Sequence, residues 1–205
     1  MNNKEEKIIL QELSLIAKGG KYSAEQIAYI ASCLTVCSVK IKAKAIWLMG
    51  EAGFKCPNSV CAYVPQIAEN MRSNDDLLRE RALNALGRIG KSEFVLSALY
   101  FTEMVSLAHD TAPNVRLAFI WACENIAVNT PEIFNDIMPV FAGLLDDENI
   151  RVRIEAPEVF RVIEKRKPEL VKPYLDTLRK IDNTDENEVV RIHANEAIKA
   201  TMKTR

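Results

Sequence analysis

A basic side chain recurs at a fixed interval along this chain. Lys42, Arg79, Arg116 and Arg153 are spaced by 37 residues each time, and Arg191 follows after 38. Each of them lies in a segment of similar sequence: IKAKAIWLMGEAG (41–53), LRERALNALGRIG (78–90), VRLAFIWACENIA (115–127), VRIEAPEVFRVIE (152–164) and VRIHANEAIKATM (190–202). A period of this length is typical of solenoids, whose units bury their apolar faces against one another. The sequence therefore predicts a stack of repeated units.

The apolar pattern within each repeat predicts two helices. The second helices carry an i, i+4, i+7, i+8, i+11 stripe, seen in Leu78, Ala82, Ala85, Leu86 and Ile89 and again in Val115, Phe119, Ala122, Cys123 and Ile126. Other apolar-periodic segments lie between these stripes, and no β pattern of useful length competes. Ser23 with Gln26 has the spacing of a capping box, Thr130 before Pro131 predicts a helix start, and Gly53 and Gly90 are expected at left-handed helix ends. The expected fold class is all-α.

The repeats resemble HEAT repeats, whose first helix carries a proline, whose turn carries an aspartate and whose second helix begins with a basic residue. Pro65 and Pro139 lie 14 residues before a basic position, and the aspartates lie six before one, at Asp110, Asp147 and Asp185; the first repeat departs with Ala28 and Val36, and the second with Ser73. The resemblance implies a right-handed α-solenoid of about five helix pairs. It also implies that each aspartate can cap the second helix and pair with basic side chains along the stack. We expect one domain, 1–205, with a capping helix at 1–20 and repeats at about 22–54, 57–90, 92–128, 131–167 and 168–204.

The net charge indicates which partners the chain can attract, and the cysteines indicate its compartment. With 27 basic and 28 acidic residues the formal charge is -1, so no global excess attracts nucleic acid or an acidic membrane. Five scattered cysteines without a C-x-x-C motif favour reduced thiols and a cytoplasmic protein. No stretch is long and apolar enough to predict a membrane span.

Positions of the second helices that packing does not require are the candidate binding residues. In the families that the chain resembles these columns face a concave groove, and here they are Lys44, Trp47, Glu51, Arg81, Asn84, Arg88, Trp121, Asn125, Glu155 and Glu158. Basic members lie towards the N-terminus and acidic ones towards the C-terminus, which predicts a bipolar groove. Trp47 and Trp121 occupy one column, either as groove anchors or as core. The predicted function is a non-enzymatic adaptor that holds a protein or peptide and needs no cofactor.

Signals for an enzyme are weak. Only His109 and His193 are present, in different repeats, and His193 with Glu196 is too small a set for a metal site. Pro157 breaks the helix rule and is expected either to bend its helix or to serve function. The alternative function is a nucleic-acid enzyme resembling the HEAT-like alkylpurine DNA glycosylases, with Trp47, Trp121 and either Glu51 or Glu124. A resemblance to the HEAT-like phycobilin lyases rests on the repeat type alone.

Overall fold

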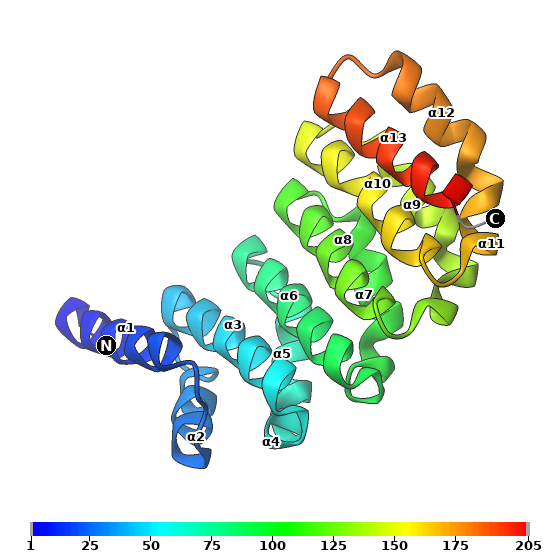
Figure 1. Cartoon of the computed structure of the whole chain (residues 1–205). Coiled ribbons are helices and arrows are strands. Elements are labelled where there is room, and N and C mark those ends of the chain that lie inside the picture. The colour runs from blue at the N-terminus through cyan, green and yellow to red at the C-terminus, as the bar shows by residue number, and fades with distance from the viewer. Residues whose placement is uncertain (1, 204–205) are drawn as a thin grey trace. The chain divides into compact units, whose positions relative to one another are not determined.

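The computed structural model describes residues 2–203, and within that range all regular structure is helical (Figure 1). The predicted all-α class is confirmed. The chain forms two compact units, an N-terminal unit at Met1–Met104 and a C-terminal unit at Val105–Arg205. Within each unit the helices pack on one another, and the apolar stripes of the second helices are buried.

The N-terminal unit is organised around α3. Its elements are α1 (Asn3–Gly19), α2 (Ala24–Cys33), α3 (Val39–Lys55), α4 (Pro57–Val60), η1 (Cys61–Tyr63), α5 (Val64–Glu69), η2 (Asn70–Arg72), α6 (Asp76–Ser92), η3 (Phe94–Leu96) and η4 (Ala98–Tyr100), and α7 (Phe101–Ser106) continues into the next unit. Helix α3 packs on α1, α2 and α6. The capping box before α2 is confirmed, because Ser23 Oγ accepts from the Gln26 amide while Gln26 Oε1 accepts from the Ser23 amide.

The C-terminal unit places α10 between α8 and α13. Its elements are η5 (Leu107–His109), α8 (Pro113–Ala127), η6 (Pro131–Ile137), α9 (Met138–Leu144), α10 (Ile150–Glu164), α11 (Pro168–Val171), η7 (Lys172–Tyr174), α12 (Leu175–Thr184) and α13 (Glu188–Lys203). The expectation for Thr130 is wrong in one respect: Pro131 begins a 3-10 helix, and the Thr130 side chain caps nothing.

Prolines divide the first helices of the repeats. Pro65 is the second residue of α5 and Pro139 the second residue of α9, each directly after a 3-10 segment. A proline is tolerated at such a start because the first amides of a helix have no partner within it. The first helix of these repeats is therefore a chain of short 3-10 and α segments, whereas the second helices α3, α6, α8 and α10 are continuous.

The repeating basic column ties neighbouring repeats together in the C-terminal unit. Arg116 donates from Nη1 to the Asp110 carbonyl and from Nε and Nη2 to the two carboxylate oxygens of Asp147, each at 2.7 Å. Arg153 repeats the pattern with the Asp147 carbonyl and the Asp185 carboxylate. In the N-terminal unit Arg79 makes the equivalent bond to the turn before its own helix, donating from Nη1 to the Ser73 carbonyl at 2.8 Å.

The aspartates of this column act differently from the expectation. Asp147 Oδ1 accepts from the Asn149 amide, and Asn149 Oδ1 in turn accepts from the Arg151 amide at the start of α10. Asn149 is therefore the helix cap, and Asp147 holds the turn before it. The predicted pairing of aspartate with a basic side chain along the stack is confirmed within the C-terminal unit.

The predicted stripes form the core. Leu78, Ala82, Ala85, Leu86 and Ile89, and Val115, Phe119, Ala122, Cys123 and Ile126, are all at most 5% exposed. Phe119 stacks on Phe141 with ring centroids 5.5 Å apart, and the Phe134 ring packs on Phe141 at 5.9 Å in a tilted arrangement. Pro157 is buried within α10, which continues through it, so the Arg153 carbonyl lacks the amide donor it would otherwise have.

The glycine expectation is wrong. Gly53 and Gly90 lie inside α3 and α6, and in the described residues the one glycine with positive φ is Gly20, at the end of α1. Gly53 allows close packing instead, since a Cβ there would lie 2.5 Å from Cγ1 of Ile89. At Gly50 a Cβ would lie 2.7 Å from the Cα of Ala85, a backbone atom that cannot move aside as a side chain can. These glycines permit the close contact of α3 with α6.

Gly50→Ala should lower the free energy of unfolding by about 1–3 kcal/mol, although alanine is the better helix former. The new methyl group would press on the Ala85 backbone of α6, which has no flexible side chain to move aside. Urea unfolding monitored by circular dichroism would measure the effect. Gly143→Ala in α9 is the matched control: a Cβ there meets nothing within 4 Å, so stability should rise by about 0.5–1 kcal/mol. Equal effects at both sites would contradict close packing as the reason for Gly50.

Candidate functional site

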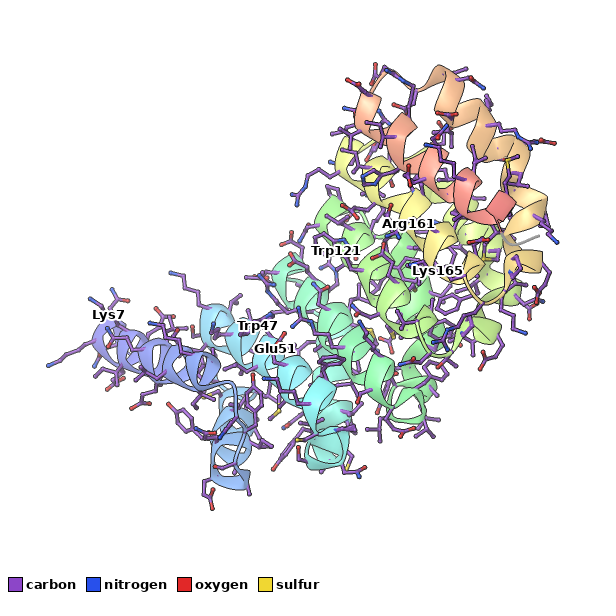
Figure 2. The ribbon with its side chains drawn as sticks, in the orientation of Figure 1. Lys7, Trp47, Glu51, Trp121, Arg161 and Lys165 are labelled. Atoms are coloured by element: carbon purple, nitrogen blue, oxygen red, sulfur yellow. The ribbon has the colours of Figure 1, made fainter. Side chains whose placement is uncertain are left out.

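The candidate binding residues lie on one kind of surface, the part of each second helix that its neighbours leave uncovered. All ten are half-buried, whereas the residues between them, such as Ile46, Leu83 and Ile120, are fully buried. Their distribution is Lys44, Trp47 and Glu51 on α3, Arg81, Asn84 and Arg88 on α6, Trp121 and Asn125 on α8, and Glu155 and Glu158 on α10. Figure 2 shows Trp47 and Glu51 on one unit and Trp121 on the other. The first six belong to the N-terminal unit and the last four to the C-terminal unit.

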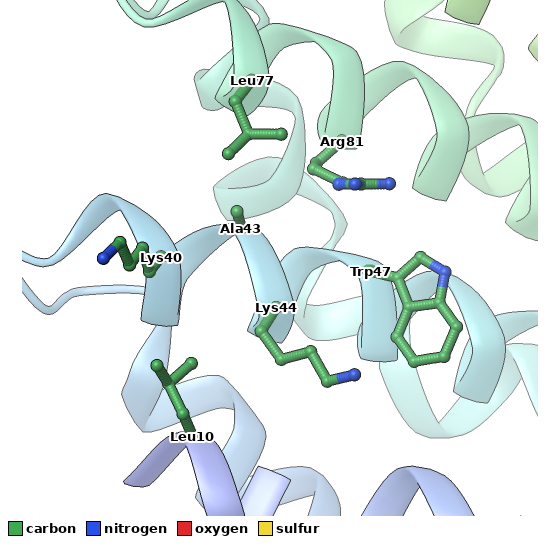
Figure 3. Close-up of a pocket in the computed structure, with 7 residues that line it drawn as sticks. All are labelled: Leu10, Lys40, Ala43, Lys44, Trp47, Leu77 and Arg81. Carbon is green, nitrogen blue, oxygen red and sulfur yellow. The ribbon is translucent and has the colours of Figure 1, made fainter. Parts of the chain in front are cut away.

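The N-terminal unit has a pocket of about 400 Å³ at this surface. Helix α3 supplies Lys40, Ala43, Lys44 and Trp47, α6 supplies Leu77 and Arg81, and α1 supplies Leu10. Figure 3 shows the ends of Lys44 and Arg81 both extending towards the Trp47 side of the pocket. The Lys44 Nζ lies 4.4 Å from the centre of the Trp47 ring, within cation–π range. The pocket thus combines an apolar wall with three cations.

The remaining residues of this unit are partly engaged with each other. Glu51 forms an ion pair with Arg88 between α3 and α6, and Asn84 lies half-buried on α6 between Arg81 and Arg88. Burial lowers the pKa of the Arg88 guanidinium. Arg81 lies 3.4 Å from a Glu80 carboxylate oxygen, and more than a third of its side chain is exposed.

The C-terminal unit presents acidic groups. Glu158 pairs with Arg161 one turn further along α10, and a second Glu158 oxygen lies 3.5 Å from Nδ1 of His193 on α13. Glu155 lies one turn before Glu158. On α8 the Asn125 side-chain amide donates to the Trp121 carbonyl at 3.0 Å, so that amide is used within its own helix.

Glu124 is the most perturbed group of this surface. Burial raises the pKa of its carboxyl to about 8, and Glu155 and Glu158 add to the rise while Arg161 opposes it. Its Oε1 atom is inaccessible and has no hydrogen-bond partner in the described structure. Glu124 is therefore protonated at neutral pH.

These states bear on the enzymatic alternative. Glu51 is neutralised by Arg88, and Glu124 holds a proton, so neither offers a free carboxylate beside its tryptophan at neutral pH. Among residues 2–203 no group of three or more His, Cys, Asp and Glu side chains is arranged to hold a metal ion. The five cysteines are free, with Cys33 and Cys123 buried.

Sequence reasoning missed Leu10, Arg161 and the burial of Glu124. Leu10 lies on α1, outside the repeats, so no column could include it. Arg161 lies three residues after Glu158, a helical ion-pair spacing that could have indicated it. Glu124 lies beside the core residue Cys123, and its burial depends on the packing of α10 on α8.

The fold is shared with helical-repeat proteins of known structure. A computationally designed armadillo repeat protein for modular peptide recognition matches with a TM-score of 0.70 and 19% identity, over 97% of this chain and 94% of that one. An engineered protein solved by a structural genomics consortium matches with a TM-score of 0.68 and 16% identity, over 93% and 83%. A homology model of the full-length AP-3 complex matches with a TM-score of 0.83 and 18% identity, over 99% of this chain and 35% of that one. The protein is therefore a HEAT-like α-solenoid, as predicted.

The family can be stated more closely. The family described as sister chromatid cohesion protein PDS5 matches residues 29–200. The chain belongs to this family. No curated protein matches the chain. No helix within residues 2–203 is long and apolar enough to cross a membrane.

Proposed function

We propose that this protein is a non-enzymatic scaffold that holds a protein or peptide partner on the uncovered faces of its second helices. The observation that carries the proposal is the pair Trp47 and Trp121: both lie in the same column of the repeat, and both are half-buried where the neighbouring column is apolar and fully buried. Large amphipathic rings at such positions are typical anchors of interfaces. The free thiols are consistent with a cytoplasmic location, which we include in the proposal.

The comparisons support the same class of function. A structural neighbour is named for modular peptide recognition. The family is named for sister chromatid cohesion, which supports the binding of a partner by a repeat scaffold. The chemistry of the surface differs between the two units, with cations around Trp47 in one and a cluster of acidic side chains, Glu124, Glu155 and Glu158, in the other. Such a surface favours a partner of mixed charge over nucleic acid, which requires many phosphate contacts by Lys and Arg.

Truncation of both tryptophans should separate binding from folding. Trp47→Ala with Trp121→Ala should lower the free energy of unfolding by much less than the roughly 3–5 kcal/mol that a fully buried tryptophan costs at each site. The same variant should lose a captured protein partner, because aromatic anchors commonly contribute more than about 2 kcal/mol to an interface. Urea unfolding and affinity capture from native lysate would measure the two effects.

Phe119→Ala is the matched control, since Phe119 is 0% exposed and lies two residues before Trp121. It should cost about 3–5 kcal/mol of stability and should affect binding only through unfolding. If the tryptophan variant unfolds as readily as the Phe119 variant, the column belongs to the core and the proposal is wrong. Base release from alkylated DNA that depends on Glu51 or Glu124 would favour the glycosylase alternative.

A further inference from the structure

The pocket of the N-terminal unit has a one-sided charge. Its lining includes Lys40, Lys44 and Arg81 and contains no acidic side chain. Lys40 is exposed, and in the described residues neither Lys40 nor Lys44 has an ion-pair partner. Arg81 lies 3.4 Å from a carboxylate oxygen of Glu80, and the two side chains are 36% and 17% exposed. The pocket therefore keeps positive charge that its own unit does not neutralise.

The same pocket has an apolar wall. Leu10, Leu77 and Trp47 are half-buried and come from three different helices, α1, α6 and α3. Figure 3 shows Leu77 above and Leu10 below Ala43 of α3, with Lys40 and Lys44 to either side. The pocket is an open depression of about 400 Å³, a volume that can take a few side chains of a peptide. A simple anion would leave this apolar surface exposed to water.

We propose that this pocket binds an acidic peptide segment of a partner protein, in which Asp or Glu side chains pair with Lys40, Lys44 and Arg81 while an adjacent leucine or phenylalanine packs on Trp47. The inference rests on the proposed function and names the chemistry of the partner. Charge complementarity selects acidic over basic segments, because a basic segment would meet three like charges. The Lys44 ammonium on the Trp47 ring holds the charge and the apolar anchor next to each other.

Selection from a phage library of random peptides on the purified full-length chain would test the proposal. The selected peptides should be enriched in Asp and Glu together with Leu or Phe. Fluorescence polarisation with a synthetic selected peptide should then show binding that weakens with salt. Lys40→Glu with Lys44→Glu should weaken it by roughly tenfold or more. Replacing the acidic residues of the peptide by Asn and Gln should have a similar effect.

Lys21→Glu is the control for a change in net charge. Lys21 is exposed and follows Gly20, whose carbonyl accepts from Lys55 at the far end of α3, so it lies away from the pocket at Lys40–Trp47. This variant should bind the acidic peptide with unchanged affinity.

The outcomes distinguish this inference from the function on which it rests. Basic or neutral peptides that bind with dependence on Trp47 or Trp121, and without dependence on the two lysines, would overturn the acidic specificity and leave peptide binding standing. Selection that enriches no peptide over the double tryptophan variant would overturn both. Displacement by inorganic phosphate alone, at the concentrations at which free acidic peptide displaces the probe, would show a phosphate site and overturn the proposal.

Discussion

Replacing Arg116 by methionine should lower the free energy of unfolding by about 3–5 kcal/mol. The guanidinium is 7% exposed and donates to both oxygens of Asp147 and to the carbonyls of Asp110 and Thr111. Methionine fills a similar volume and satisfies none of these acceptors, so the nearly inaccessible Asp147 carboxylate loses its counter-ion. Urea unfolding at neutral pH would measure the loss.

Two further variants show whether the cost comes from the unpaired carboxylate. Arg151→Met removes an exposed arginine at the start of α10 and should change stability by no more than about 0.5 kcal/mol. Arg116→Met combined with Asp147→Leu removes both charges and should cost less than the sum of the single changes. If the loss of stability in the double variant equals the sum of the losses in the two single variants, the cost does not come from an unpaired Asp147 carboxylate.

The importance of Arg116 could be read from the sequence, because a basic residue recurring every 37 positions is visible without a structure. The spacing of Asp147 from Arg153 likewise predicted its column. What the spacing could not supply is which groups the aspartate contacts: the resemblance suggested a helix cap, and Asn149 performs that role. A cap depends on the φ and ψ angles of a turn, and two adjacent polar residues offer the same chemistry.

The uncovered columns of the second helices were predictable for a similar reason, since helical periodicity determines which residues neighbouring helices cover. The degree of burial was not predictable. Gly50 and Gly53 look like ordinary helix weaknesses in the sequence, and their role becomes evident from the distance to Ala85 and Ile89 on α6. The pocket at Trp47 needs Leu10, which belongs to α1 and lies outside the repeat pattern.

Glu124 should make the stability of the protein fall as pH rises from about 5 to about 8. Its carboxyl titrates near pH 8 in the folded protein and near its ordinary value of 4.5 when unfolded. Between those values the folded chain keeps a proton that the unfolded chain releases, so raising the pH favours unfolding, by at most about 1.4 kcal/mol per pH unit. The stabilisation is complete below about pH 4.5 and is lost as pH rises towards 8.

The raised pKa of the Glu124 carboxyl follows from its burial and from the charged groups that face it. Glu155 and Glu158 on α10 repel its charge, Arg161 on the same helix attracts it, and burial between α8 and α10 is the largest contribution to the raised pKa. On α13, Nδ1 of His193 lies 3.5 Å from a Glu158 carboxylate oxygen, so this imidazole faces the same acidic cluster. Glu196 on α13 interacts with Arg161 as well.

Glu124→Gln should remove most of the pH dependence, because glutamine keeps the shape of the protonated side chain, can donate to the neighbouring carboxylates and cannot ionise. We expect the difference in stability between the variant and the original chain to shift in favour of the variant by roughly 3–4 kcal/mol between pH 5 and pH 8. Urea midpoints across this range would measure the difference. Glu132→Gln, at an exposed position of the same unit, should leave the slope unchanged. Equal slopes for the original chain and the Glu124 variant would show that Glu124 ionises without cost to the fold, and its burial against α10 would then not control its protonation.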